Sequence, residues 1–171
     1  MPAPLRSRPL RFRELRFREA VRALVLSPDD EVLLARFVFP NGVEVWALPG
    51  GGLEDGESDE EGLRRELHEE LGLTDVSIGP HVWNREHIVP MRTGHDGQRD
   101  HVHLVRTGRF EPEPTIGWPA MREEYVFELR WWTVDEIAGR SDLRFVPRRL
   151  AAHLADLLRD GAPPRPIDVG V

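Results

Sequence analysis

The stretch GGLEDGESDEEGLRRELHEELGL, residues 51–73, decides the fold. Ser58 followed by three acidic residues forms a capping box, and the acids suit the positive end of a helix dipole. Leucines recur every four residues after it, and Gly72 is a natural terminator. The leucines are Leu63, Leu67 and Leu71. The stretch therefore predicts a helix that begins after Ser58, buries one leucine stripe and ends before Gly72.

Three glutamates of this helix fall beside the leucine stripe: Glu66, Glu69 and Glu70. At 100° per residue they lie within an arc of about 100°. Like charges four residues apart repel, and the repulsion grows where water is partly excluded. Oxygen ligands at this spacing suit Mg²⁺ or Mn²⁺, which substrate phosphates usually help to coordinate. The pattern predicts a divalent-metal site open to phosphate.

Glycines support the same reading. The loop LPGGGLEDGE, residues 48–57, can bring bare carbonyls and amides close to the glutamates. Gly62 lies one turn before Glu66, although glycine inside a helix costs roughly 0.5 to 1 kcal/mol relative to alanine. We infer that space is needed at this point of the helix.

The stretch resembles the Nudix box: glycine, five residues, glutamate, seven residues, then Arg-Glu-aliphatic-x-Glu-Glu-x-Gly-aliphatic. The matching residues are Gly51, Glu57, Arg65, Glu66, Leu67, Glu69, Glu70, Gly72 and Leu73, without departure. An isolated acidic helix is usually a solvated face, but the full pattern between predicted strands favours a site. The stretches WALPGG and LRWWTVDEI are also similar to those of bacterial members.

The resemblance implies an α/β fold, the Nudix-type α/β/α sandwich with a mixed central sheet. It implies hydrolysis of a nucleoside diphosphate linked to another group, by water attack on phosphorus with Mg²⁺, or Mn²⁺, as cofactor. Glu66, Glu69 and Arg65 are then catalytic, and Glu57 with Arg65 organises the site. The metal site implied is Gly50, through its carbonyl, with Glu57, Glu66, Glu69 and Glu70.

The general base implied by the family is either a glutamate of the box or one from a later loop. Residues 109–125 are long for a connection within a compact domain, which favours a functional segment. Glu123 and Glu124 precede a strand expected to return toward the site, so they are candidate bases, with a solvated role as the alternative. Trp118 is a candidate to stack on a base or, equally, to cover the core.

The histidine-rich hairpin offers weaker signals. His101 and His103 alternate on one strand face, but two histidines without a third partner at a known spacing do not establish a zinc site. Arg85 and Arg99 bracket the same hairpin and are candidates to bind substrate phosphates. The alternative, that both are surface arginines, is slightly favoured in a chain whose basic residues are all arginine.

Composition excludes several classes of function. The chain has 171 residues, a formal net charge of -7 and no cysteine, which removes disulfides, thiolate zinc sites and cysteine nucleophiles. The acidic balance argues against nucleic-acid binding, which needs clustered positive charge. No apolar run approaches the ~18 residues of a membrane span, and the start lacks the apolar core of a secretory signal. We expect a soluble, cytoplasmic monomer or homodimer without a membrane partner.

The remaining pattern predicts one Nudix-like domain over residues 17–161, an arginine-rich lead-in over 1–16 and a loose tail over 162–171. Helices are expected after Thr133, which forms a capping box with Glu136, and across a leucine-rich segment that ends at Gly161. Strands are expected at 21–26, 31–39, 43–48, 76–87, 101–106 and 125–132.

The substrate is not fixed by the sequence. Isopentenyl diphosphate isomerases of the family use a cysteine, which this chain lacks. Nucleoside triphosphates, including oxidised ones, nucleotide sugars and dinucleoside polyphosphates stay as candidates. The alternative function is a catalytically silent Nudix-fold sensor that binds a nucleotide, although all the metal glutamates are present. A nucleic-acid-binding role for the arginine arm is disfavoured by the acidic body.

Overall fold

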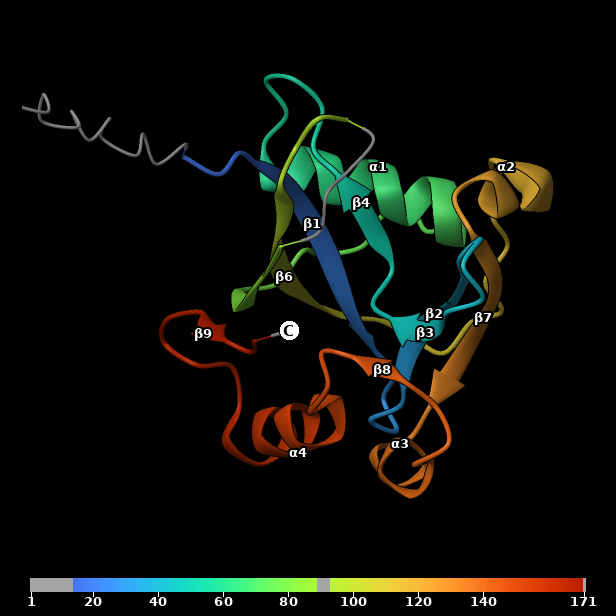
Figure 1. Cartoon of the computed structure of the whole chain (residues 1–171). Coiled ribbons are helices and arrows are strands. Elements are labelled where there is room, and N and C mark those ends of the chain that lie inside the picture. The colour runs from blue at the N-terminus through green and yellow to red at the C-terminus, as the bar shows by residue number, and fades with distance from the viewer. Residues whose placement is uncertain (1–13, 89–92, 171) are drawn as a thin grey trace, which may run out of the picture.

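The computed structural model describes residues 14–88 and 93–170. Within these ranges four strands precede the first helix, and further strands and helices follow it (Figure 1). The elements are β1 (Phe17–Leu26), β2 (Val32–Val38), β3 (Glu44–Ala47), β4 (Gly50–Gly52), α1 (Asp59–Leu71), β5 (His81–Ile88), β6 (Gly97–Arg106), α2 (Gly117–Glu123), β7 (Val126–Trp132), α3 (Val134–Gly139), β8 (Phe145–Val146), α4 (Leu150–Asp160) and β9 (Ile167–Asp168). Most of the arginine-rich lead-in, residues 1–13, lies outside the described residues.

Strand β1 organises the sheet. It runs parallel to β6 over its whole length, from the pair Phe17 and Gly97 to the pair Leu26 and Arg106. On its other side it pairs antiparallel with β4 along residues 20–22 and then with β2 at Leu26. Strand β2 continues the sheet by pairing with both β3 and β7. Because β1 changes partners, the sheet splits on this side, and the glycine loop of β4 stands beside the split.

Two apolar clusters cover opposite faces of the sheet. Val21, Ala23 and Val25 pack with the leucines of α1, whereas Leu24 and Leu26 pack with α4 on the other face. Alternation of side chains along β1 produces this division. Figure 1 shows α1 on one side of the sheet and α3 and α4 on the other. The predicted α/β/α sandwich with a mixed sheet is therefore confirmed.

Helix α1 has the ends that the sequence predicts. The Ser58 hydroxyl accepts a hydrogen bond from Glu61 N, and the Glu61 carboxylate accepts one from Ser58 N at 2.9 Å. Gly72 ends the helix in the left-handed conformation, at φ 70°. The leucine stripe is buried, with Leu63 fully inaccessible. Local sequence therefore fixes where α1 begins, where it ends and which face it buries.

Two segments differ from the sequence predictions. The expectation of a loose C-terminal tail was wrong for residues 167–169, because β9 pairs in parallel with β5 and Val169 is buried. This pairing covers an otherwise open strand edge. The segment 109–125, expected as a long connection, contains the short helix α2, which Met121 anchors in the core. Within the described ranges, none of the helices combines the length and apolar character needed to cross a membrane.

Replacing Ser58 with alanine removes the acceptor of the capping box. We expect Ser58→Ala to lower the free energy of unfolding by about 1 kcal/mol, the usual cost of losing such a cap. Urea unfolding measures the change, and Ser141→Ala, at an exposed position, is the matched control. A Ser58→Ala variant as stable as the control would show that the cap does not stabilise α1.

Candidate metal and substrate site

The glycine loop meets α1 at Gly50. This residue has φ 127°, and a Cβ placed on it would lie 2.2 Å from the Val21 carbonyl oxygen, so only glycine fits. Gly50 N donates a 2.8 Å hydrogen bond to Glu70 Oε2, and the Glu70 side chain is buried. The pairing of β4 with β1 thereby places a backbone amide against a buried carboxylate of the helix.

Gly62 allows the loop to reach the helix. A Cβ at this position would lie 2.4 Å from Leu53 Cδ2 and 3.0 Å from Glu57 Oε2. The inference that space is needed here is confirmed, because the entry loop packs directly on this turn of α1.

Arg65 joins the loop to three carboxylates. Its guanidinium donates to both oxygens of Glu57 at 2.9 Å, to Glu66 Oε1 at 2.8 Å and to the Gly52 carbonyl at 3.1 Å. Glu69 Oε2 lies at 3.5 Å from the same side chain. The Arg65 side chain therefore orients carboxylates that would otherwise repel one another.

The electrostatics of the site are dominated by two buried carboxylates. Burial, followed by the charge of Glu66, raises the pKa of Glu70 to about 8. Burial also raises the pKa of Glu66, against the opposing effect of Arg65. Glu57 behaves oppositely, since hydrogen bonds from Arg65 lower its pKa to about 2. The buried pair thus carries a charge cost that a cation would relieve, and its oxygen donors fit Mg²⁺ or Mn²⁺.

The structure brings together only part of the predicted metal set. Glu66, Glu70 and Gly50 meet at the junction of loop and helix, while Glu69 sits at its half-exposed margin and Glu57 is held by Arg65. The Gly50 carbonyl, predicted as a ligand, accepts a hydrogen bond from Arg22 Nη1. In the described part of the chain, the three helix glutamates do not place three oxygens within 4.8 Å of one another.

The candidate base and substrate-binding residues of the segment 109–125 lie in different parts of the structure. The charge of Glu124, which follows the last residue of α2, contributes to the raised pKa of Glu70. Glu123 is exposed one residue earlier. Trp118 packs against the small cluster of Ala35, Met121 and Val126, which corresponds to the alternative of covering the core.

The sequence did not predict a buried ionic network around Asp100. Asp100 accepts hydrogen bonds from Arg22 Nε at 3.2 Å, Arg85 Nη1 at 2.9 Å and Gln98 Nε2 at 2.7 Å. Burial alone would raise the pKa of Asp100, but the charges of Arg22 and Arg85 outweigh it and lower the pKa. The available signal was Arg22 itself, a charged residue inside the otherwise apolar run of residues 21–26.

This network connects the glycine loop to the second sheet face. Arg22 alternates with Val21 and Ala23, so it points away from α1 while its guanidinium also reaches the Gly50 carbonyl. Arg85, one of the two arginines predicted as phosphate ligands, belongs to this network through Asp100. Arg99 does not, because it pairs with Glu86 at 2.7 Å and covers the Phe17 ring.

Comparison with known proteins identifies the family. A family model described as NUDIX domain matches residues 16–154. The chain belongs to the Nudix family. Relatives that match part of it include the nucleoside triphosphatase NudI of Escherichia coli O139:H28 and that of Salmonella arizonae, each 39% identical over 74 residues. Each alignment covers 41% of this chain and 48% of the relative, so the chain spans about half the length of these relatives.

Solved Nudix structures share the fold. The MutT protein from Methanosarcina mazei Go1 has a TM-score of 0.61 at 21% identity, with 87% of this chain and 98% of that chain covered. The NUDIX domain of Shewanella oneidensis NrtR, solved in complex with ADP ribose, has a TM-score of 0.59 at 18% identity over 90% and 94% of the two chains. At such low sequence identity, the structural similarity establishes the fold of this Nudix chain and nothing more.

The raised pKa of Glu70 predicts a pH-dependent stability of the metal-free protein. The stability that the protonated Glu70 side chain contributes is fully present below pH 4.5, the ordinary pKa of this group. It is lost as pH rises through about 8. Glu70→Gln stays neutral, so in a chelator it should unfold at higher urea than wild type at about pH 9, with the gain vanishing at about pH 4.

The matched control for this pH test is Glu60→Gln, which changes an exposed glutamate of the same helix. It should follow the pH dependence of wild type. If Glu70→Gln also follows it, the Glu70 carboxylate does not carry the burial cost inferred from the structure.

Proposed function

We propose that this Nudix chain is a divalent-metal-dependent pyrophosphohydrolase. It would cleave the diphosphate bridge of a nucleoside diphosphate linked to another group, by attack of water on phosphorus. The observation that carries the proposal is the buried pair of Glu66 and Glu70 beside the Gly50 amide, inside a complete Nudix box. Mg²⁺ is the proposed cofactor, with Mn²⁺ as the other ion that such oxygen ligands suit.

Glu66 and Glu70 are the residues that would hold the ion, with Glu69 at the margin. When bound, the ion would neutralise diphosphate charge and lower the pKa of a coordinated water. The chain contributes positioning, because Arg65 fixes Glu66 and Glu57 while the Gly50 amide fixes Glu70. Oriented groups of this kind need no reorganisation during the reaction.

Glu124 is the proposed general base. It is the residue that caps the C-terminal end of α2, away from the helix of the box glutamates, and its charge acts on Glu70. It would accept the proton of the attacking water at a carboxylate oxygen. Glu123 is the less favoured neighbour, because Glu124 is the one whose charge contributes to the raised pKa of Glu70.

A nucleoside triphosphate is the first substrate to test. This choice rests on the nucleoside triphosphatase relatives, whose 74 matched residues are 39% identical to this chain. Nucleotide sugars, dinucleoside polyphosphates and ADP-ribose contain the same diphosphate linkage and complete the panel. A sensor that binds a nucleotide without cleaving it is the outcome that the same panel would reveal.

Hydrolysis of this panel with Mg²⁺ or Mn²⁺, with products resolved by chromatography, tests the function. We expect cleavage at a diphosphate bridge by wild type and by Glu60→Gln, the exposed control on α1. Glu70→Gln should lose at least about 100-fold in rate, the upper end of what loss of an outer-shell partner costs a metal site. Tight binding of a panel member without cleavage by wild type would replace the enzyme with the sensor.

The identity of the base is tested by two neighbouring variants. We expect Glu124→Gln to lower kcat by about 10² to 10⁴, the range that a general base supplies, with KM little changed. Glu123→Gln should have the smaller effect, since Glu124 is the neighbour whose charge acts on Glu70. Equal losses of kcat in the two variants would contradict the assignment of Glu124.

A further inference from the structure

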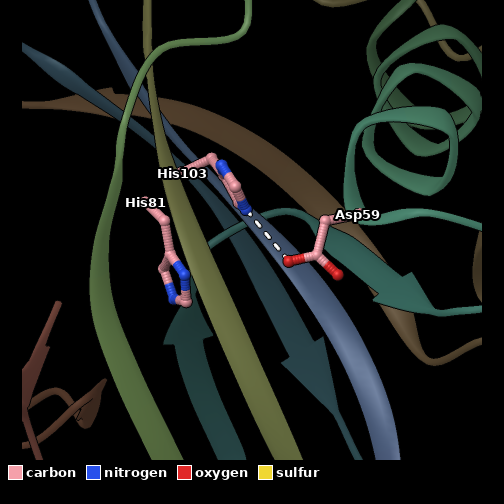
Figure 2. A group of neighbouring side chains, drawn as sticks. All are labelled: Asp59, His81 and His103. Carbon is pink, nitrogen blue, oxygen red and sulfur yellow. Dashed lines mark hydrogen bonds and ion pairs between the residues drawn. The ribbon is translucent and has the colours of Figure 1, made fainter.

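A second cluster of metal-binding side chains lies away from the glutamates. Asp59 is the first residue of α1, His81 begins β5 and His103 lies on β6. One ligand atom from each falls within 4.8 Å of the others. Figure 2 shows the three side chains extending from these separate elements into one space. Among the described residues, this is the group of histidines and carboxylates that meets such a limit.

The sheet register creates this cluster. His81 and His103 are cross-strand partners, and their rings stack with centroids 4.9 Å apart. His101 follows the same alternation along β6, so it reaches the same face, and its Nδ1 lies 2.8 Å from Asp59 Oδ2. Three imidazoles and one carboxylate therefore converge below the start of α1.

Backbone carbonyls lie beside a ring nitrogen of His81 and of His103. His81 Nε2 lies 3.0 Å from the Trp83 carbonyl oxygen, and His103 Nδ1 lies 3.5 Å from that of Gly79. A carbonyl oxygen only accepts, so His81 Nε2 is the donor of its neutral ring and His81 Nδ1 presents a lone pair. His103 faces an acceptor on each side, so its Nε2 can serve as a metal ligand once its hydrogen is displaced, as metal binding requires. Such outer hydrogen bonds are those that orient metal-binding histidines.

His103 also contacts Asp59. His103 Nε2 lies 3.2 Å from Asp59 Oδ2 and donates a hydrogen bond to it, drawn as the dashed line in Figure 2. A cation held by His81 Nδ1, His103 Nε2 and the carboxylate would take the place of that hydrogen.

The geometry selects the cation. Two ligands of a tetrahedral Zn²⁺, each at about 2.0–2.1 Å, stand about 3.3 Å apart, close to the 3.2 Å between His103 and Asp59. The other separations between ligand atoms do not exceed 4.8 Å. Imidazole nitrogens suit zinc, whereas Mg²⁺ takes oxygen ligands. We propose that Asp59, His81 and His103 form a zinc site distinct from the glutamate site.

This zinc site would tie the start of α1 to the hairpin of β5 and β6. Asp59 directly follows the Ser58 cap, and both histidines belong to the sheet under the helix. Zinc that binds the folded chain but not the unfolded one raises the free energy of unfolding in proportion to the logarithm of the free zinc concentration. The site does not depend on the proposed hydrolase activity, because it shares no ligand with the glutamates.

The test uses the full chain, stripped with a chelator and then titrated with Zn²⁺ in excess Mg²⁺ by calorimetry. We expect one zinc per chain in wild type. His103→Ala and Asp59→Asn should each weaken zinc by at least about 100-fold, because each removes a ligand. Asp59→Asn keeps the shape of the side chain and so separates metal loss from misfolding. His68→Ala, an exposed histidine on α1, is the matched control and should bind zinc like wild type.

A second readout is the visible spectrum with Co²⁺ in place of Zn²⁺, which reports four-coordinate nitrogen and oxygen ligation. We expect the spectrum in wild type, His68→Ala and Glu70→Gln, and its loss in Asp59→Asn. Zinc binding that survives in Asp59→Asn and His103→Ala but disappears in Glu70→Gln would assign the ion to the glutamates. That result, or no zinc binding by wild type, would overturn the proposal.

Discussion

The hydrogen bond from Gly50 N to Glu70 is the interaction on which the site depends. It holds a carboxylate inside the protein, one helical turn from the carboxylate of Glu66, at a cost that burial and like charge both raise. The bond requires a glycine at φ 127° pressed against β1, and so requires the pairing of β4 with β1. The split in the sheet, the glycine loop and the acidic helix α1 are therefore linked by this one hydrogen bond.

The same junction links the two faces of the sheet. On the α1 face, Arg65 gathers the carboxylates of the Nudix box. On the opposite face, Arg22 connects the Gly50 carbonyl to Asp100 and, through it, to Arg85. A ligand that contacts this buried network would therefore touch residues that Arg22 links to the glycine loop, and this loop holds Glu70. This arrangement connects the Asp100 network directly to the proposed catalytic face.

Local features were predictable from sequence, and distant ones were not. The ends and buried stripe of α1 follow from Ser58, the leucines and Gly72, all within one short stretch, and the Nudix box identified the fold. The pairs Arg22 with Asp100 and Asp59 with His103 are 78 and 44 residues apart and depend on strand register. Two histidines on one strand did not reveal the third, or the aspartate, because the pairing of β5 with β6 was unknown. For the same reason, the pairing of β9 with β5 was missed.

The central claim is that Glu66 and Glu70 are kept buried in order to bind a divalent ion. Electron paramagnetic resonance of Mn²⁺ tests it most directly, because the signal of the free aqueous ion falls as the ion binds. We predict that wild type and the exposed-site variant Glu60→Gln remove this signal with the same affinity, and that Glu70→Gln does not. Equal Mn²⁺ affinity in Glu70→Gln and wild type would contradict the account.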